Sequence, residues 1–421
     1  MALPAAAAEV NQAEAGAWFA RRYGRGPDGI WFAPGRVNLM GGPDYTEVFV
    51  LPFTLGAGVT AAAARRPDRR IALTSRQAGG EPVLLDIDAL EPGSVTGWAA
   101  YPAGVAWALR QAGYLAGGAD LAIDADLPAG AGLSSSAALE CAAALALTGL
   151  YQVSAPRREL AALARQAENE FAGVPCGIMD QIATLLGRAG HALLLDCRSG
   201  TGTAVPLDPA AAGLMLLVID TRARHALGDG RYAQRRRACE AAASALGVRA
   251  LRDLTEEDLA RLADPALKRL AGHVIAENRR VLRAAELLRA GDQAAIGPLL
   301  TESHRSLRDR FEVSWPQADE AVAAAVEAGA AGARMTGGGF GGCVVALAPV
   351  ERATQVRAAV TERFSRHRWP APHYLDAVPS NGARRVAPVR CCRLAAARVR
   401  RRRRKASGRT RRSRIRRSPA Q

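Results

Sequence analysis

The sequence lacks any cysteine pattern typical of a metal site or a disulfide framework. Its seven cysteines are scattered singly, apart from the adjacent pair Cys391 and Cys392. None of them has zinc-site spacing, and unpaired cysteines of this kind are typical of proteins from reducing compartments. We therefore expect a cytoplasmic protein.

Long apolar runs and a targeting segment are also missing. Glu140 interrupts the best candidate for a membrane span, so we expect no transmembrane helix. The first residues, Met1–Glu9, contain no basic residue and an early acid, so we predict no signal peptide.

Two signatures of phosphate-transferring enzymes are absent as well. The chain has no G-x-x-x-x-G-K-[ST] loop and neither the H-R-D nor the D-F-G motif of protein kinases. If the protein binds a phosphate, serine hydroxyls and backbone groups must hold it without the usual lysine.

Acidic residues are missing from one end of the chain only. The segment 386–421 carries 15 Lys and Arg residues and no Asp or Glu, whereas the rest has 41 basic and 40 acidic residues. The body is therefore not a nucleic-acid-binding surface by charge. We expect the tail to be disordered. It is either an arm for nucleic acid or an anionic surface, or an extension without a role, and we favour the second interpretation.

The chain is organised around the segment 127–139, Leu-Pro-Ala-Gly-Ala-Gly-Leu-Ser-Ser-Ser-Ala-Ala-Leu. It follows a predicted strand over 121–126 and leads into a predicted helix over 137–147. Glycines permit a tight turn, and the free N–H groups of a helix N-terminus attract anions, above all phosphate. A plain strand–turn–helix joint capped by serines is the alternative.

An arginine and an aspartate follow a short predicted strand, Ile30–Pro34. Arg36 comes after a Pro-Gly turn, and Asp44 lies in a second turn rich in Gly and Pro. This pair suits a polar ligand with hydroxyl and phosphate groups. A surface arginine and a turn-forming aspartate are the alternative.

Two further carboxylates are candidates for chemistry. Asp180 follows a Pro-Cys-Gly loop in apolar surroundings and could accept a proton from a hydroxyl group, or merely cap a helix. Glu168 could hold a divalent cation with Ser136, or lie exposed on a helix predicted over 156–172. Trp98, before a helix predicted over about 101–115, could stack on a purine or belong to the core.

The second half contains a predicted strand over 213–220, which we expect to open another domain. A polar stretch with Tyr232 and a solvated helix face with Arg235–Arg237 follow, and then helices to about residue 330. The glycines of 337–342 leave the backbone bare for a phosphate or for close packing. Further strands are predicted near 57–63, 70–75, 82–87, 191–197 and 343–347.

Together these stretches resemble the galactokinases of the GHMP small-molecule kinase superfamily, over roughly residues 18 to 383. The superfamily motifs are Pro34–Asn38, Leu127–Leu139 and Met335–Cys343, and the stretches particular to galactokinases are Val174–Gln181, Gly190–Ser199 and Ser303–Pro316.

The resemblance implies a two-lobed α/β (α+β) fold with mixed sheets and an active site between the lobes. It implies an N-terminal arm over 1–17, lobes over 18–205 and 206–385, and a tail over 386–421. It also implies transfer of the ATP γ-phosphoryl group to the anomeric hydroxyl of galactose, with Mg²⁺.

The roles of individual residues are likewise implied by the resemblance. Asp180 would be the catalytic base, Arg36 would stabilise the transferring phosphoryl group, and Ser136 and Glu168 would hold Mg²⁺. The remaining implied contacts are with ATP, from Trp98, Gly130, Ala131, Gly132, Leu133, Ser134, Ser135 and Ser136, and with the sugar, from Asp44, Gly177 and Tyr232.

One departure from the family pattern concerns the sugar. Galactokinases usually read Gly-Glu-His-Thr-Asp-Tyr, where this chain reads Gly-Gly-Pro-Asp-Tyr over 41–45, one residue shorter. The Glu and His that grip the sugar 6-hydroxyl are missing, and Glu47 and Val48 replace a Gly-Gly pair. Two lost hydrogen bonds cost about 1–3 kcal/mol each. We expect altered galactose recognition, and a sugar without a 6-hydroxymethyl group, such as arabinose, becomes an alternative.

Two other functions remain alternatives. A relative that binds sugar and ATP without turnover would be a sensor, although the intact 134–137 segment and Asp180 favour an enzyme. A kinase for mevalonate or homoserine is disfavoured by the match over Val174–Gln181.

Overall fold

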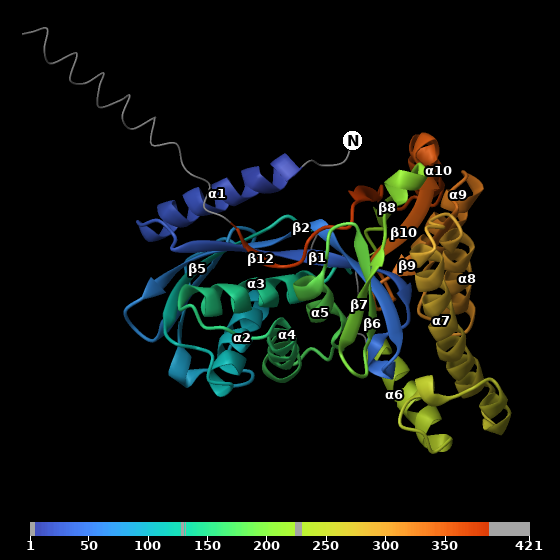
Figure 1. The fold of residues 1–421 in the computed structure, drawn as a ribbon, viewed down its shortest axis with the longest axis horizontal. Coiled ribbons are helices and arrows are strands. Elements are labelled where there is room, and N and C mark those ends of the chain that lie inside the picture. Colours follow the sequence, from blue (N-terminus) through green and yellow to red (C-terminus); the bar gives the residue numbers. More distant parts are fainter. Residues whose placement is uncertain (1–4, 128–129, 131, 224–229, 387–421) are drawn as a thin grey trace, which may run out of the picture. The chain divides into compact units, whose positions relative to one another are not determined.

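Two β-sheets organise the protein (Figure 1). The larger sheet has eight strands with the order β12-β1-β2-β5-β3-β4, to which β6 is added beside β2 and β7 beside β6. The smaller sheet has the order β11-β8-β10-β9. The strands are β1 Gly29–Gly41, β2 Phe49–Arg66, β3 Arg70–Ser75, β4 Val83–Asp86, β5 Gly118–Ala125, β6 His191–Asp196, β7 Thr201–Pro206, β8 Leu214–Asp220, β9 Gly332–Thr336, β10 Cys343–Pro349, β11 His373–Ala377 and β12 Arg384–Val386.

The computed structural model describes residues 5–127, 130, 132–223 and 230–386. Ala131 of the predicted phosphate loop and the basic tail from Ala387 onward lie outside these residues. Among the helices described, none has the length and apolar character needed to cross a membrane. The α-helices are α1 Ala5–Tyr23, α2 Ala100–Gln111, α3 Ser135–Leu150, α4 Arg157–Gln166, α5 Met179–Leu186, α6 Arg231–Ala245, α7 Pro265–Arg289, α8 Ile296–Asp309, α9 Pro316–Glu327 and α10 Ala353–Arg366.

Helices cover both faces of the larger sheet (Figure 1). Helix α1 lies on one face, where Phe19 packs with the small side chains of Ala62, Ala64 and Ala122. Helices α2 to α5 lie on the other face. Helix α3 is rich in alanine, so it approaches β1 and β2 closely and places its N-terminus beside the edge where the site forms.

The smaller sheet is packed against helices from the second half of the chain. Helices α8 and α9 contact β9, and α7 also contacts β1 and β2 of the larger sheet. Apart from the parallel pair β3 and β5, the paired strands are antiparallel. The mixed α/β fold expected from the sequence is confirmed.

The first strand differs from its prediction. We expected it to end at Pro34 and to be followed by a turn, but β1 continues through Arg36 to Gly41. The Pro34-Gly35 pair is an irregularity in the pairing with β2, not a turn. A Cβ on Gly35 would lie 2.8 Å from the Leu133 carbonyl oxygen, so glycine allows the loop before α3 to approach β1. The Arg36 N–H then donates to that same carbonyl oxygen over 3.1 Å.

Other predicted elements hold with changed limits. The strand predicted near 57–63 is the middle of the longer β2, and the helix predicted over 156–172 is α4 followed by a π-helical turn, Ala167–Phe171. Such turns are frequent at functional sites, and this one carries Glu168.

Candidate functional site

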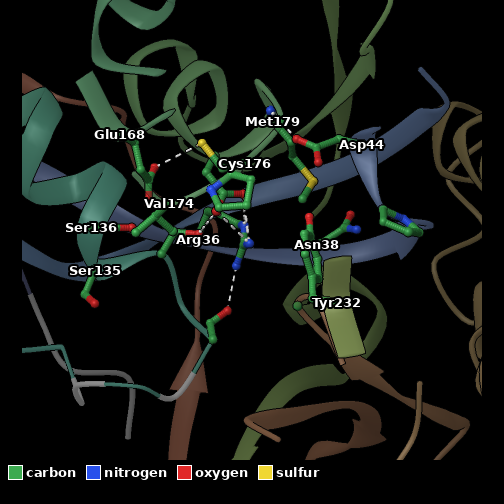
Figure 2. A pocket seen from close by; sticks show the side chains of 18 of the residues that line it. Arg36, Asn38, Asp44, Ser135, Ser136, Glu168, Val174, Cys176, Met179 and Tyr232 are labelled. Carbon is green, nitrogen blue, oxygen red and sulfur yellow. Dashed lines mark hydrogen bonds and ion pairs between the residues drawn. The ribbon is translucent and has the colours of Figure 1, made fainter. Parts of the chain in front are cut away.

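A pocket brings together most of the residues singled out from the sequence (Figure 2). Strand β1, the loop before α3, the start of α5, the start of α6 and the glycine loop after β9 contribute to its wall. The lining residues are Arg36, Asn38, Gly42, Pro43, Asp44, Gly130, Gly132, Ser134, Ser135, Ser136, Glu168, Val174, Pro175, Cys176, Gly177, Met179, Asp180, Gly230, Tyr232, Ala233, Gly337 and Gly338.

An ion pair between Arg36 and Asp180 occupies the centre of the pocket. Arg36 Nε donates to Asp180 Oδ1 over 2.8 Å, and Nη2 donates to Oδ2 over 2.9 Å. Arg36 Nη1 donates to the Gly132 carbonyl oxygen over 2.7 Å. The arginine side chain is 6% exposed and that of Asp180 is 25% exposed, so the carboxylate faces the open space. Bidentate pairing fixes its orientation.

Ser134 adds a third donor to this carboxylate. Its hydroxyl donates to Asp180 Oδ2, and it makes no capping hydrogen bond to α3 although it occupies the N-cap position. The residue has a φ of 59°, an unusual value for a non-glycine residue, which turns the side chain toward the pocket. The interpretation of Ser134 as a simple helix cap is therefore wrong.

The phosphate-loop prediction fits the backbone geometry. Gly130 and Gly132 have φ angles of 72° and 73°, which glycine adopts readily, and Ser135 and Ser136 begin α3 at the pocket wall. The glycine loop after β9 lies against the same turn, because a Cβ on Gly337 would be 3.4 Å from the Gly132 carbonyl oxygen. Free N–H groups of the α3 N-terminus are suited to an anion.

Glu168 lies at one end of the pocket and is held by several donors. Gln181 Nε2 donates to its Oε2 over 2.8 Å, Cys176 Sγ lies 3.2 Å from the same atom, and the Ser136 hydroxyl also bonds to the carboxylate. The residue is 5% exposed, so the alternative of an exposed helical glutamate is wrong. Burial raises the pKa of Glu168, which the hydrogen bonds oppose.

Asp44 lies at the other end, close to Gly177. Asp44 Oδ2 accepts a hydrogen bond from the Met179 N–H over 2.9 Å. A Cβ on Gly177 would come within 2.0 Å of the carboxyl group, so only glycine fits at that position. Burial, and then the nearby charge of Asp180, raise the pKa of Asp44 to about 6.

Tyr232 projects from the first turn of α6 toward Met179 (Figure 2). Its ring packs edge-on against Tyr45, with 5.2 Å between the ring centroids. Burial raises the pKa of Tyr232 well above its ordinary value, so the hydroxyl stays a neutral hydrogen-bonding group.

Two predicted ATP contacts do not line this pocket. Trp98 lies in the short 3₁₀ turn before α2, partly buried against the core. The Leu133 side chain is buried in the core, and its carbonyl oxygen accepts a hydrogen bond from the Arg36 backbone N–H. Their contacts with ATP stay predictions, as does that of Ala131, which lies outside the described residues.

Sequence reasoning missed several residues of the site. Asn38 and Cys176 line the pocket, and Gln181 bridges Glu168 and the buried Glu140. Asn38 belongs to the Pro34–Asn38 motif and Cys176 to the Val174–Gln181 stretch. Their closeness in sequence to Arg36 and Asp180 could therefore have indicated that they line the site. No signal pointed to Glu140, which looked like a polar interruption of an apolar helix.

The geometry agrees with comparisons to known proteins. Residues 100–188 match the GHMP kinases N terminal domain, residues 284–366 match the GHMP kinases C terminal domain, and residues 17–65 match the galactokinase galactose-binding signature. That signature matches across the shortened 41–45 segment.

Curated relatives are similar over nearly their whole length. A galactokinase of Streptomyces coelicolor is 47% identical over 87% of this chain and 97% of its own, and one of Mycobacterium tuberculosis is 46% identical over 79% and 93%. A solved structure, Lactococcus lactis galactokinase complexed with galactose, matches with a TM-score of 0.84 and 30% identity over 88% of this chain and 98% of its own.

More distant structures share the fold. A mevalonate kinase matches with a TM-score of 0.61 at 17% identity, over 84% of this chain and 99% of its own. The resemblance inferred from the motifs, and with it the expectation of a sugar kinase, is thus confirmed: the chain belongs to the galactokinase family of GHMP kinases.

Proposed function

We propose that this pocket transfers the γ-phosphoryl group of ATP to the anomeric hydroxyl of galactose, with Asp180 as the general base. The observation that carries the proposal is the Asp180 carboxylate, which faces the pocket while Arg36 and Ser134 hold it. The base removes the proton of the anomeric hydroxyl as its oxygen bonds to the γ-phosphorus and the bond to the β-bridging oxygen breaks.

Arg36 supports two parts of this reaction. Its bidentate pairing positions the base, and the guanidinium charge lies between the base and the phosphate loop. Three of its five N–H donors are engaged by described residues, which leaves donors for the transferring phosphoryl oxygens. Catalysis of this kind depends on positioning and charge stabilisation.

The Glu168 end of the pocket fits a divalent cation. Within the described residues no group of three or more His, Cys, Asp or Glu side chains could hold a metal ion by itself. The buried Glu168 carboxylate and the adjacent Ser136 hydroxyl are nevertheless hard oxygen ligands, and Mg²⁺ prefers few such ligands together with phosphate oxygens. When bound there, Mg²⁺ would neutralise phosphate charge.

The sugar end contains Asp44, Gly177 and Tyr232. The Asp44 carboxylate has no guanidinium partner among the described residues, so it is suited to accept hydrogen bonds from sugar hydroxyls. Gly42 and Pro43 replace the side chains that most galactokinases use here, which keeps arabinose as an alternative sugar.

A coupled assay of ADP release tests the proposal. Galactose, arabinose and mevalonate are compared with the unsubstituted protein, with Asp180→Asn and with Asp124→Asn. Asp124 is a matched control, since it is buried, pairs with Arg76 and lies away from the pocket. We expect galactose turnover, a loss of about 10³-fold in kcat for Asp180→Asn and no loss for Asp124→Asn. Turnover that survives Asp180→Asn contradicts the assigned base, and binding of sugar without turnover supports a sensor.

Two finer expectations remain proposals. The free thiols are Cys141, Cys176, Cys197, Cys239 and Cys343, and they support a location in the reducing cytoplasm.

We also propose that the basic tail contributes nothing to phosphorylation and has no nucleic-acid partner that alters the activity. The chain should be cut after Val386, because Val386 pairs with Ile30 in β12 and β1. Changed kcat or KM after this truncation would refute that part of the proposal.

A further inference from the structure

We propose that Asn38 is a specificity-determining residue whose side-chain oxygen accepts a hydrogen bond from the 6-hydroxyl of the sugar. The inference rests on the proposed function and adds a contact at the end of the pocket where the chain is one residue short.

The Asn38 side chain contains a buried acceptor with nothing to accept from. Asn38 lines the pocket and is 3% exposed. Its Nδ2 donates to the Gly41 carbonyl oxygen over 3.2 Å, whereas its Oδ1 has no hydrogen-bond partner among the described residues. A buried amide oxygen without a partner is costly, so such an atom in a pocket wall indicates a ligand donor.

The orientation of this amide is fixed by its neighbours. The Gly41 carbonyl oxygen accepts from both Asn38 Nδ2 and Arg334 Nη2, the latter over 3.1 Å, and the Gly41 N–H donates to Glu277 Oε1 over 3.1 Å. Turning the Asn38 amide over would bring its oxygen against the Gly41 oxygen. The unpartnered atom is therefore an acceptor, and it requires a donor such as a hydroxyl group.

Asn38 lies where we expect the part of the sugar farthest from the anomeric carbon. Figure 2 shows Ser135, Ser136 and Glu168 on one side of Arg36, and Asn38 with Tyr232 on the other. In-line transfer places the accepting hydroxyl on the side of the phosphoryl group opposite its leaving group. A hexose with its anomeric carbon at Asp180 therefore extends away from the serines, toward Asn38.

Of the adjacent loop residues that line the pocket, Asp44 alone has a polar side chain. Gly42 and Pro43 line the pocket next to Asn38 and have no side-chain donor or acceptor. Asp44 is held by the Met179 N–H near Gly177. Asn38, supplied by the rigid strand β1, therefore takes over a contact that a longer loop would otherwise make.

Substrate deletion tests the contact. The ratio of kcat/KM for galactose to kcat/KM for 6-deoxygalactose is measured for the unsubstituted protein, Asn38→Ala and Asn278→Ala. The matched control, Asn278, has its Oδ1 bonded to the Phe49 N–H over 3.0 Å, so it holds the other end of the same loop without lining the pocket. 2-Deoxygalactose serves as the control sugar.

We expect the unsubstituted protein to prefer galactose by about tenfold, and Asn38→Ala to reduce this preference to about twofold or less. Asn278→Ala should lower kcat/KM for galactose and for 6-deoxygalactose by the same factor, so that their ratio is kept. A purely structural effect of Asn38→Ala would keep the ratio in the same way. Discrimination against 2-deoxygalactose should persist in Asn38→Ala.

Several results would overturn the inference. The first is equal use of both sugars by the unsubstituted protein, a measurement that needs no variant to fold. Another is a preserved ratio in Asn38→Ala, and a third is a ratio that collapses in Tyr232→Phe instead. Absence of any galactose turnover contradicts the proposed function and is thus distinguishable from failure of the Asn38 contact.

Discussion

The two aspartates of the pocket are held in opposite ways. Asp180 receives both arms of a guanidinium and a serine hydroxyl, whereas Asp44 is bonded by backbone N–H groups, that of Met179 among them, and lies in the field of the other carboxylate. The Asp180 carboxylate is thus compensated in charge before any ligand arrives. The end with Asp44 contains acceptors that a ligand must complete, so under the proposed function it is the part of the pocket that we expect to tune the choice of sugar.

Removing the guanidinium should have the largest effect. Arg36→Met leaves Asp180 without its ionic partner and the phosphoryl group without a nearby cation. We expect kcat to fall about 10³-fold, at the level found for charge-stabilising groups in other enzymes. The loss is measured by ADP release at saturating galactose and ATP. Arg363→Met, which breaks partly exposed pairs with Glu320 and Glu327 away from the pocket, should leave kcat unchanged. An equal loss in this variant would mean that the assay reports instability.

Neutralising the other aspartate should affect binding more than rate. Asp44→Asn removes a charged acceptor, so we expect KM for galactose to rise about 100-fold, since a hydrogen bond to a charged group is worth about 1.5–3 kcal/mol. The matched control is Asp120→Asn, whose buried carboxylate pairs with Arg25 and Arg66 outside the pocket.

The raised pKa of Asp44 adds a pH dependence to this prediction. The unfolded chain releases the Asp44 proton near pH 4 and the folded protein releases it near pH 6, so the aspartate lowers stability as the pH rises between these values. Asp44→Asn should therefore raise the melting temperature at pH 8 and leave it nearly unchanged at pH 4. In the unsubstituted protein, KM for galactose should rise below pH 6. If Asp44→Asn is less stable than the unsubstituted protein at pH 8, then the Asp44 charge does not destabilise the folded state.

Adding a methyl group should disturb only the sugar end. Gly177→Ala places a Cβ about 2.0 Å from the Asp44 carboxyl atoms, which must move. We expect KM to increase about tenfold, because moving the carboxyl group costs about 1–2 kcal/mol of strain, and we expect kcat to change less. Gly272→Ala, in α7 with its nearest neighbour 3.5 Å away, should instead stabilise the protein slightly. If Gly177→Ala leaves KM for galactose unchanged, then Asp44 does not contribute to sugar binding.

The smallest effect concerns the residue that replaces a glycine of the family pattern. Glu47 pairs with Arg198 over 2.6 Å and with Arg249 over 2.8 Å. Glu47→Ala should cost about 1 kcal/mol of unfolding free energy, because partly exposed ion pairs contribute little. Urea unfolding measures this cost, and the cost should shrink in about 0.5 M salt, where the Debye length is about half its value at physiological ionic strength. A cost independent of salt would show that Glu47 acts by packing instead.

Periodicity and motif spacing predicted much of the fold. The strand over 121–126, the helix that follows it, and the strand at 343–347 all exist as β5, α3 and β10. Each of these elements is specified by its own apolar pattern and by the glycines that bound it. The meeting of Arg36, Asp180 and Glu168 in one pocket was expected from the resemblance, and the pocket brings them together.

Features that depend on contacts between distant segments were not predictable. The strand β1 continues through Pro34 because it pairs with β2, a gain that local turn propensity does not include. Ser134 turns away from its helix because Asp180 lies within reach, and Asn38 is left with a free oxygen because Gly41 is held by α7 and β9.

The return of β12 to the larger sheet has a mechanical consequence. The chain passes from the larger sheet to the smaller one after β7 and comes back between β11 and β12, where Ser380 and Gly382 are bonded to Thr54 and Gly187. The sheets are thereby tethered at two places, and a swing about a single hinge would stretch one tether. We therefore expect substrates to enter by displacement of loops, while the relative orientation of the sheets stays constant through the catalytic cycle.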